Sequence, residues 1–176
     1  MKIHLVISAL GKDRPGILSE LSKAIMDSAC TILDSRMTML GGEFAGILLV
    51  SGNWSSVAKL EDALNGLQES LGLMLTARRT EPPAPQTRLL PYVVEIATVE
   101  QPGIVYRLAD FFTSRNIGIQ ELYTGCYSTP HSDTPLFSLT MTVNISTDLH
   151  IASLREQFMD FCDELNLDGV IEPLKR

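Results

Sequence analysis

The chain has 176 residues, of which 45% are hydrophobic and 20% are charged, and this composition is typical of a folded protein rather than a disordered or collagen-like one. Fourteen basic and 21 acidic side chains give it a net charge of −7. Direct binding of DNA or RNA normally requires clustered basic side chains, and no run of Lys and Arg here exceeds two residues. We therefore expect no direct contact with nucleic acid.

The first half of the chain predicts six elements in the order strand, helix, strand, strand, helix, strand. Alternating apolar residues predict the strands, and apolar residues at three- and four-residue spacing predict the helices. Gly41-Gly42 supplies the positive φ angles that a tight hairpin turn needs. The predicted ranges are Lys2–Leu10, Pro15–Ala29, Thr31–Leu40, Phe44–Ser51, Ser55–Leu71 and Leu73–Arg79.

The second half repeats this pattern. The segment Asp13–Leu18 resembles Glu100–Val105 at an offset of 87 residues, and the same offset pairs the apolar residues of Ile3–Ala9 with those of Leu90–Ile96. From the second predicted helix onward the offset is 94, so the second copy contains seven extra residues. We expect Ser128–Pro135, which replaces the two-glycine turn, to accommodate them.

A proline-rich segment separates the two copies. Pro82, Pro83 and Pro85 favour an extended spacer. We therefore expect a first domain over residues 1–81, a linker over 82–88 and a second domain over 89–176. The predicted fold class is α+β, with two ferredoxin-like βαββαβ domains in tandem, each an antiparallel sheet with its helices on one face.

A Pro-Gly step stands at the start of the first helix in both copies, as Pro15-Gly16 and Pro102-Gly103. Proline is tolerated in the first turn of a helix, and glycine lets another backbone or a ligand approach closely. The free N–H groups at a helix start can bind a carboxylate. The alternative is a strand-to-helix turn with a structural role alone, and both interpretations stay open.

We expect the start of the second strand to lie opposite this turn and beside the first strand. In the second copy, Asn116 and Gln120 can hydrogen-bond the amine and carboxylate of a ligand. Alternatively, Asn116 caps the end of the preceding helix, where asparagine is favoured. The first copy has Ala29 in place of Asn116, so the two sites would differ in chemistry.

Nothing in the sequence predicts catalysis, a metal site or a cofactor. His4, His131 and His150 lack the spacing of metal ligands, and there is no phosphate-binding glycine motif. No apolar stretch approaches the ~20 residues that span a bilayer, and the N-terminal segment does not resemble a signal peptide. We therefore expect no membrane association.

The three cysteines predict a reducing environment. Cys30, Cys126 and Cys162 are odd in number and distant in sequence, which argues against a disulfide framework and fits the cytoplasm. We expect each of them to be a small buried apolar residue.

The segments Gly11–Ile17 and Thr31–Met37, together with the βαββαβ duplication, resemble tandem ACT-domain proteins. More narrowly, the chain is similar to the glycine cleavage system transcriptional repressor family, over essentially its whole length. This resemblance implies modules that bind amino acids or similar small metabolites at an interface between two modules. It also implies control of glycine-cleavage genes through a partner transcriptional activator rather than through DNA contact.

The resemblance places the ligand contacts at the turn before the first helix and at the start of the second strand. The implied ligand is a small amino acid, with glycine first, and a homo-oligomer stays open. In the first copy the implied contact residues are Asp13, Arg14, Pro15, Gly16, Ile17, Ile32, Leu33 and Asp34. In the second copy they are Gln101, Pro102, Gly103, Ile104, Asn116, Ile117, Gly118, Ile119 and Gln120.

Three functions are consistent with the sequence. The first is a ligand-sensing regulator without catalytic activity. The second is a protein-interaction module without ligand binding, and the third is a regulatory subunit of a metabolic enzyme. Because the last predicted strand ends close to Arg176, we expect no catalytic domain to follow it.

Overall fold

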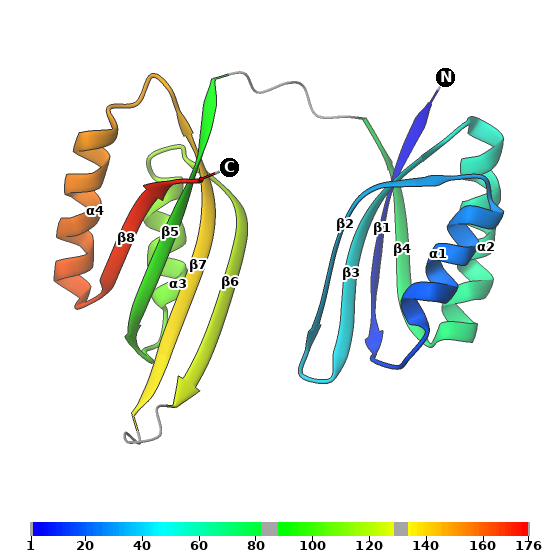
Figure 1. Ribbon diagram of the computed structural model, residues 1–176, viewed down its shortest axis with the longest axis horizontal. Coiled ribbons are helices and arrows are strands. Elements are labelled where there is room, and N and C mark those ends of the chain that lie inside the picture. The colour runs from blue at the N-terminus through cyan, green and yellow to red at the C-terminus, as the bar shows by residue number, and fades with distance from the viewer. Residues whose placement is uncertain (1, 82–87, 129–133, 176) are drawn as a thin grey trace. The chain divides into compact units, whose positions relative to one another are not determined.

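The computed structural model describes residues 2–81, 88–128 and 134–175 (Figure 1). The first unit consists of β1 (Ile3–Lys12), α1 (Ile17–Asp27), β2 (Thr31–Leu40), β3 (Glu43–Gly52), α2 (Trp54–Leu71) and β4 (Leu73–Thr80). The second unit consists of β5 (Leu89–Val99), α3 (Ile104–Thr113), β6 (Gly118–Ser128), β7 (Pro135–Ser146), α4 (Ile151–Leu165) and β8 (Asp168–Pro173).

Each unit is an antiparallel four-stranded sheet with both helices on one face (Figure 1). The strand orders are β2-β3-β1-β4 and β6-β7-β5-β8, so the two units share one topology. The first strand of each unit is central, and Leu5 of β1 lies opposite Val50 of β3 and Arg79 of β4. The predicted pair of ferredoxin-like βαββαβ domains is confirmed.

Each unit buries its own hydrophobic core between sheet and helices. In the first unit the alternate β1 residues Leu5 and Ile7 are inaccessible to solvent, as is Leu21 of α1. In the second unit Phe112 of α3 and Phe158 of α4 are equally buried. The alternation and the helical stripes identified in the sequence are therefore the inward faces of these elements.

The chain divides into two compact units, residues 1–84 and 85–176. Of the predicted linker over 82–88, only Arg88 falls within the described residues. In the predicted insertion Ser128–Pro135, residues 129–133 likewise lie outside them.

The sequence placed the first residues of α1 too early. The predicted helix began at Pro15, whereas α1 begins at Ile17 and Gly16 is its N-cap, with Pro15 in the preceding turn. Proline fits a helix start equally well, but Gly16 has a φ of 97°, which lies outside helical geometry. The predicted end at Ala29 is also two residues beyond the observed end at Asp27.

Three helices end on a non-glycine residue in the left-handed conformation: Ala29 after α1, Asn116 after α3 and Asn166 after α4. After α3, the N–H of Asn116 donates to the Thr113 carbonyl and the N–H of Ile117 to the Phe112 carbonyl, which is the Schellman arrangement. Asparagine tolerates this conformation, whereas alanine is strained in it by roughly 1–2 kcal/mol. Asn116 therefore caps a helix, as one of the two sequence interpretations held.

We expect the replacement Ala29→Asn to stabilise the protein by about 1 kcal/mol, because Ala29 is exposed and the new side chain relieves only backbone strain. The reverse change at the equivalent position, Asn116→Ala, should destabilise by a similar amount. Urea unfolding of the two variants checks this. An unchanged or lowered midpoint for Ala29→Asn would contradict it.

The prediction for the cysteines is wrong at one position. Cys30 and Cys162 are buried, but Cys126 is exposed on β6. Burial raises the pKa of the Cys162 thiol to about 11, with Asp163 and Asp168 adding to the effect, and burial also raises the pKa of Cys30. Both buried thiols are therefore protonated and poorly nucleophilic at neutral pH.

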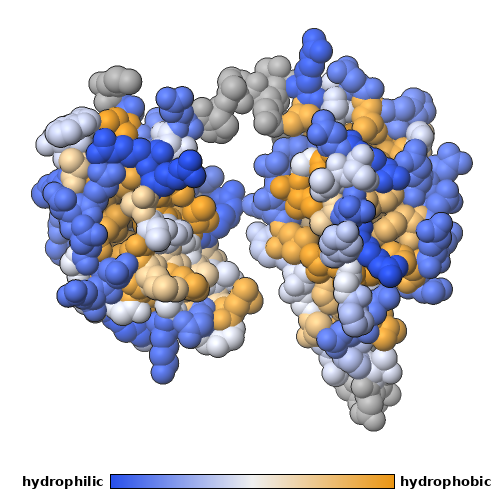
Figure 2. All heavy atoms as spheres, turned by 180° about the vertical axis from the view of Figure 1, so that it is seen from behind, coloured by the Kyte–Doolittle hydropathy of each residue, from blue (hydrophilic) through white to orange (hydrophobic). Residues whose placement is uncertain are grey.

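Several large apolar side chains remain on the surface, including Trp54, Met26 and Tyr106. Hydrophobic residues are also visible among the hydrophilic ones on the face shown in Figure 2. The Phe111-Phe112 pair is buried, as expected for core packing.

None of the helices in the described part of the chain is long and apolar enough to cross a bilayer.

Candidate ligand-binding site

In the first unit the predicted site turn joins the end of β1 to α1. The N–H of Asp13 donates to the carbonyl of Gly42 at 3.1 Å, which ties the turn to the β2–β3 hairpin. Gly16 caps the helix through its backbone, because the Glu20 N–H donates to the Gly16 carbonyl at 2.9 Å. The next residue, Ile17, is buried in the core. Of the described side chains, none caps this helix start.

The glycine of each turn is required by its backbone conformation. Gly16 has a φ of 97° and Gly103 a φ of 80°, a region that residues with a Cβ rarely adopt. The sequence argument gave close approach as the reason for glycine. The structure gives a second reason, the positive φ. Close approach alone does not require glycine at position 103, because a Cβ there would meet no described atom within 4 Å.

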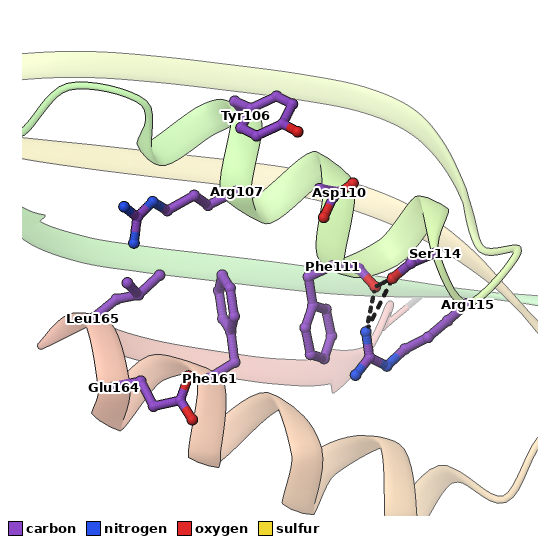
Figure 3. A pocket seen from close by; sticks show the side chains of 9 residues that line it. All are labelled: Tyr106, Arg107, Asp110, Phe111, Ser114, Arg115, Phe161, Glu164 and Leu165. Carbon is purple, nitrogen blue, oxygen red and sulfur yellow. Dashed lines mark hydrogen bonds between the residues drawn. The ribbon is translucent and has the colours of Figure 1, made fainter.

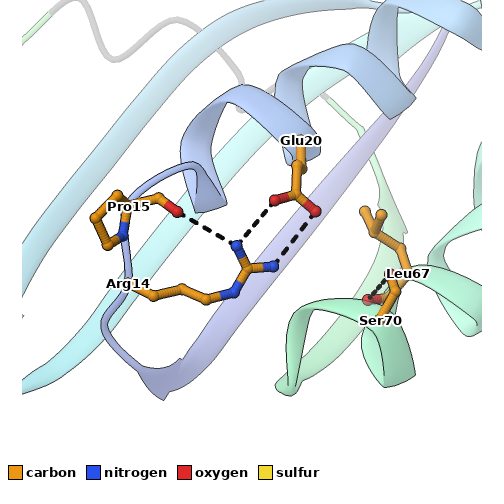
Figure 4. A network of polar contacts seen from close by, with 5 residues as sticks. All are labelled: Arg14, Pro15, Glu20, Leu67 and Ser70. Atoms are coloured by element: carbon orange, nitrogen blue, oxygen red, sulfur yellow. Dashed lines mark hydrogen bonds and ion pairs between the residues drawn. The ribbon is translucent and has the colours of Figure 1, made fainter.

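An ion pair covers the helix start of the first unit (Figure 4). The Arg14 guanidinium donates to both carboxylate oxygens of Glu20, at 2.9 and 3.3 Å, and to the carbonyl of Pro15 at 3.3 Å. This hydrogen bonding holds the pKa of Glu20 below its ordinary value. A Cβ at Gly16 would lie 3.3 Å from Glu20 Oε1, so a carboxylate of the chain itself stands beside the α1 start.

The helix start of the second unit carries no such ion pair within the described residues. Gln101 replaces Arg14 and Arg107 replaces Glu20. The Gln101 amide instead donates to the Thr98 hydroxyl at 3.4 Å and to the Leu165 carbonyl at 3.5 Å. Ile104 is buried, while Pro102 and Gly103 are exposed, which leaves the start of α3 open to solvent.

The terminal carbonyls of α4 lie close to this turn. Gln101 reaches the Leu165 carbonyl, and the Thr98 hydroxyl donates to the Asn166 carbonyl at 3.5 Å. The positive end of the α3 dipole and the negative end of the α4 dipole therefore stand close together. This juxtaposition can bind opposite charges of one small molecule.

The start of the second strand does not lie opposite the turn of its own unit, and this prediction is wrong. β2 is an edge strand beside β3, with Thr31 opposite Ser51, whereas the turn follows Lys12, which lies opposite Glu43 at the other end of β3. The intervening helix α1 has 11 residues and is about 16 Å long. Within one unit the two predicted residue sets are therefore separated.

Both second strands contain an irregularity at a predicted contact residue. The β2–β3 register shifts between Ile32 and Asp34, and the β6–β7 register shifts between Ile119 and Glu121. Leu33 and Gln120 are thus the unpaired residues of β-bulges, and both are exposed. Bulges commonly redirect side chains next to functional sites.

The remaining predicted residues are mainly structural. Ile32 and Ile119 pack against the cores, and Ile117 is buried. Asp34 accepts hydrogen bonds from the Arg36 guanidinium and from the Ser35 N–H at 2.8 Å, and these bonds, chiefly the one from Arg36, hold its pKa below the ordinary value. Gly118, the first residue of β6, is exposed.

Sequence reasoning missed Glu20, Arg107 and the carbonyls at the end of α4. The exchange of Arg14 and Glu20 for Gln101 and Arg107 across the repeat was visible in the sequence and signals two electrostatically different helix starts. The carbonyls left no signal, because every residue has one.

Two βαββαβ units whose first helices begin at a Pro-Gly turn define a tandem ACT-domain protein, and the family model for the ACT domain matches residues 3–78. The chain is 30% identical over 172 residues to the glycine cleavage system transcriptional repressor of Escherichia coli K12, covering 96% of this chain and 88% of that protein. The repressor of Shigella flexneri matches equally well. The chain therefore belongs to the glycine cleavage system transcriptional repressor family.

Solved structures match along the whole chain. The crystal structure of a putative glycine cleavage system transcriptional repressor is 29% identical, with a TM-score of 0.75 over 100% of this chain and 99% of that one. A crystal structure of a protein of unknown function from Galdieria sulphuraria is 25% identical, with a TM-score of 0.82 over 99% of this chain and 100% of that one. Both solved chains therefore share the two-unit fold over their full length.

Proposed function

We propose that the protein is a non-catalytic regulator that senses a small amino acid, glycine first, and controls glycine-cleavage genes through a partner transcriptional activator in the cytoplasm. The uncapped start of α3 at Gly103 is the single observation that carries this proposal, and membership of the repressor family supports it. The acidic net charge of −7 favours an action through protein rather than through DNA.

The carboxylate of the ligand binds at the start of α3. The N–H groups of the first turn point outward from the positive end of the helix, and no described side chain caps them. The open space at Gly103 admits a ligand close to the backbone. In the first unit the Glu20 carboxylate, paired with Arg14, stands beside the equivalent position, so the second unit is the better anion site.

The ammonium group of the ligand faces the end of α4. Within the described residues, the Leu165 carbonyl accepts a long hydrogen bond from Gln101 and the Asn166 carbonyl accepts one from Thr98, at 3.5 Å each. Carbonyl oxygens at a helix C-terminus attract cations. A zwitterion as small as glycine has no side chain that the turn must accommodate.

A thermal-unfolding panel of all common amino acids tests the sensor. A ligand at about 100 times its Kd stabilises the fold by about 2.7 kcal/mol. For a protein of this size that is a shift in Tm of several degrees, at about 2–4 °C per kcal/mol. We expect glycine to produce the largest shift. A Tm that no amino acid changes would favour the alternative, an interaction module without ligand binding.

We expect the purified protein alone to leave duplex DNA unshifted in a mobility assay at low salt. Its acidic charge and the lack of a basic run provide no surface that could displace counterions from the phosphates. A candidate activator should shift its operator, and adding this protein should change that complex. Sequence-specific retardation by this protein alone would overturn the expectation.

A further inference from the structure

A cavity of about 430 Å³ lies between α3 and α4 of the second unit (Figure 3). Its lining on this side runs from Tyr106, in the first turn of α3, to Arg115, two residues beyond the end of that helix. Its volume is within the range of small-molecule sites. The glycine proposal shares with this lining the Leu165 carbonyl and the Tyr106 amide, and the lining side chains serve neither that proposal nor the family resemblance.

The floor of the cavity is aromatic. The Phe111 ring is buried between the helices, tilted by 41° to the Phe161 ring with centroids 4.9 Å apart, so Phe161 and Leu165 provide the accessible apolar surface (Figure 3). In the first unit, Ala24 is equivalent to Phe111 and Leu67 is equivalent to Phe161. The second unit therefore has an aromatic surface that its sister unit lacks, suited to an apolar side chain.

The charged side chains around this floor are not neutralised by one another. Arg107, Asp110 and Glu164 line the cavity, and no ion pair joins any of them to a described residue. In the first unit, by contrast, the residues equivalent to Arg107 and Asp110 are both paired, Glu20 with Arg14 at 2.9 Å and Lys23 with Asp27 at 2.6 Å.

Arg115 is held in place and completes the wall. Its guanidinium stacks on the Phe111 ring at 3.8 Å, and it donates to the Phe111 carbonyl at 2.8 Å and to Gln157 at 2.9 Å. Arg107, whose side chain makes no hydrogen bond to a described residue, is the cation freer to turn toward a ligand carboxylate, while Asp110 and Glu164 offer partners for an ammonium group.

We propose that this cavity binds a free α-amino acid with an aromatic or large aliphatic side chain, distinct from the glycine site at Gly103. The side chain packs on Phe161 and Leu165, the carboxylate pairs with Arg107, and the ammonium group faces Asp110 or Glu164. Charges of both signs around one apolar floor match a zwitterion better than a simple anion or cation.

Titration calorimetry with L-phenylalanine and L-leucine tests the proposal, with phenylacetate and phenethylamine as analogues that each lack one charge. We expect both amino acids to bind. Each analogue should bind about tenfold or more weakly than L-phenylalanine, because it lacks one charged contact. Arg107→Gln should weaken L-phenylalanine by about tenfold or more and leave phenethylamine unchanged. Arg155→Gln, the same change at an exposed site of α4 outside the cavity, should have no effect.

Phe161→Leu separates this cavity from the glycine site. It keeps an apolar residue at a half-buried position, and cooperative unfolding confirms that the variant is folded. We expect it to weaken L-phenylalanine and to leave the response to glycine unchanged. The proposal is overturned if neither amino acid binds, if Arg107→Gln has no effect, or if Gly103→Asn abolishes L-phenylalanine binding while Phe161→Leu does not.

Discussion

Replacing Phe112 by alanine will lower the free energy of unfolding by about 3–5 kcal/mol, because a large buried side chain leaves a cavity that the fold cannot fill. Phe112 is inaccessible to solvent, and its ring lies 5.0 Å from Phe111 and 6.0 Å from Phe158. Urea unfolding followed by circular dichroism measures the loss.

The duplicated fold supplies the control for this substitution. Ile25 occupies the equivalent position in α1 and is 1% exposed, so Ile25→Ala should cost about 2–5 kcal/mol. Thr113→Ala, at the neighbouring exposed position of α3, should change stability by less than about 0.5 kcal/mol. A loss below 1 kcal/mol for Phe112→Ala would mean that the aromatic core does not hold the second unit together.

Gly103→Asn will remove the glycine-induced rise in Tm while retaining a folded protein. Asparagine tolerates a positive φ, and a Cβ at Gly103 meets no described atom within 4 Å, so the fold itself accommodates the change. The new side chain fills the space that the ligand carboxylate needs and can cap the first-turn N–H groups itself. Valine is a poorer probe, because a β-branched residue at this φ adds strain.

Gly72→Asn is the matched control for this variant. Gly72 also has a positive φ, of 64°, and open space around its Cβ position, but it ends α2 in the other unit. We expect this variant to keep the full response to glycine. A normal glycine response in Gly103→Asn would move the site away from the α3 start.

The local elements could be predicted from the sequence, and the reason lies in their periodicity. Leu5 and Ile7 are alternate residues of β1, and the apolar residues of α2 and α4 recur at helical spacing. The sequence of each element therefore indicates which of its faces is buried. The repeat then predicts the same topology for both units, because both have the same order of elements with the same buried faces.

The position of β2 in the sheet was not predictable in this way. The Gly41-Gly42 turn predicts that β2 pairs with β3, but nothing local indicates that β3 rather than β2 also pairs with β1. Strand pairing depends on contacts distant in sequence. Within one unit the start of the second strand therefore lies away from the turn, and the groups beside the α3 turn are instead the carbonyls of Leu165 and Asn166.

The sequence explains only in part why Gly16 and Gly103 are glycines. A Pro-Gly pair at a helix start is compatible with proline in the first turn, and only the backbone angles of Gly16 and Gly103 show that glycine is the cap. The pairing of Arg14 with Glu20 also depends on the direction of α1 relative to the turn, which the sequence leaves undetermined.

Amide chemical shifts of the ¹⁵N-labelled protein during a glycine titration test the central claim most directly. The account predicts saturable shifts at the first-turn amides of α3, Ile104, Val105 and Tyr106, and smaller or no shifts at the amides of Ile17, Leu18 and Ser19, where Glu20 stands beside the helix start. If glycine at millimolar concentration leaves the amides of both helix starts unmoved, the protein does not sense glycine at these turns.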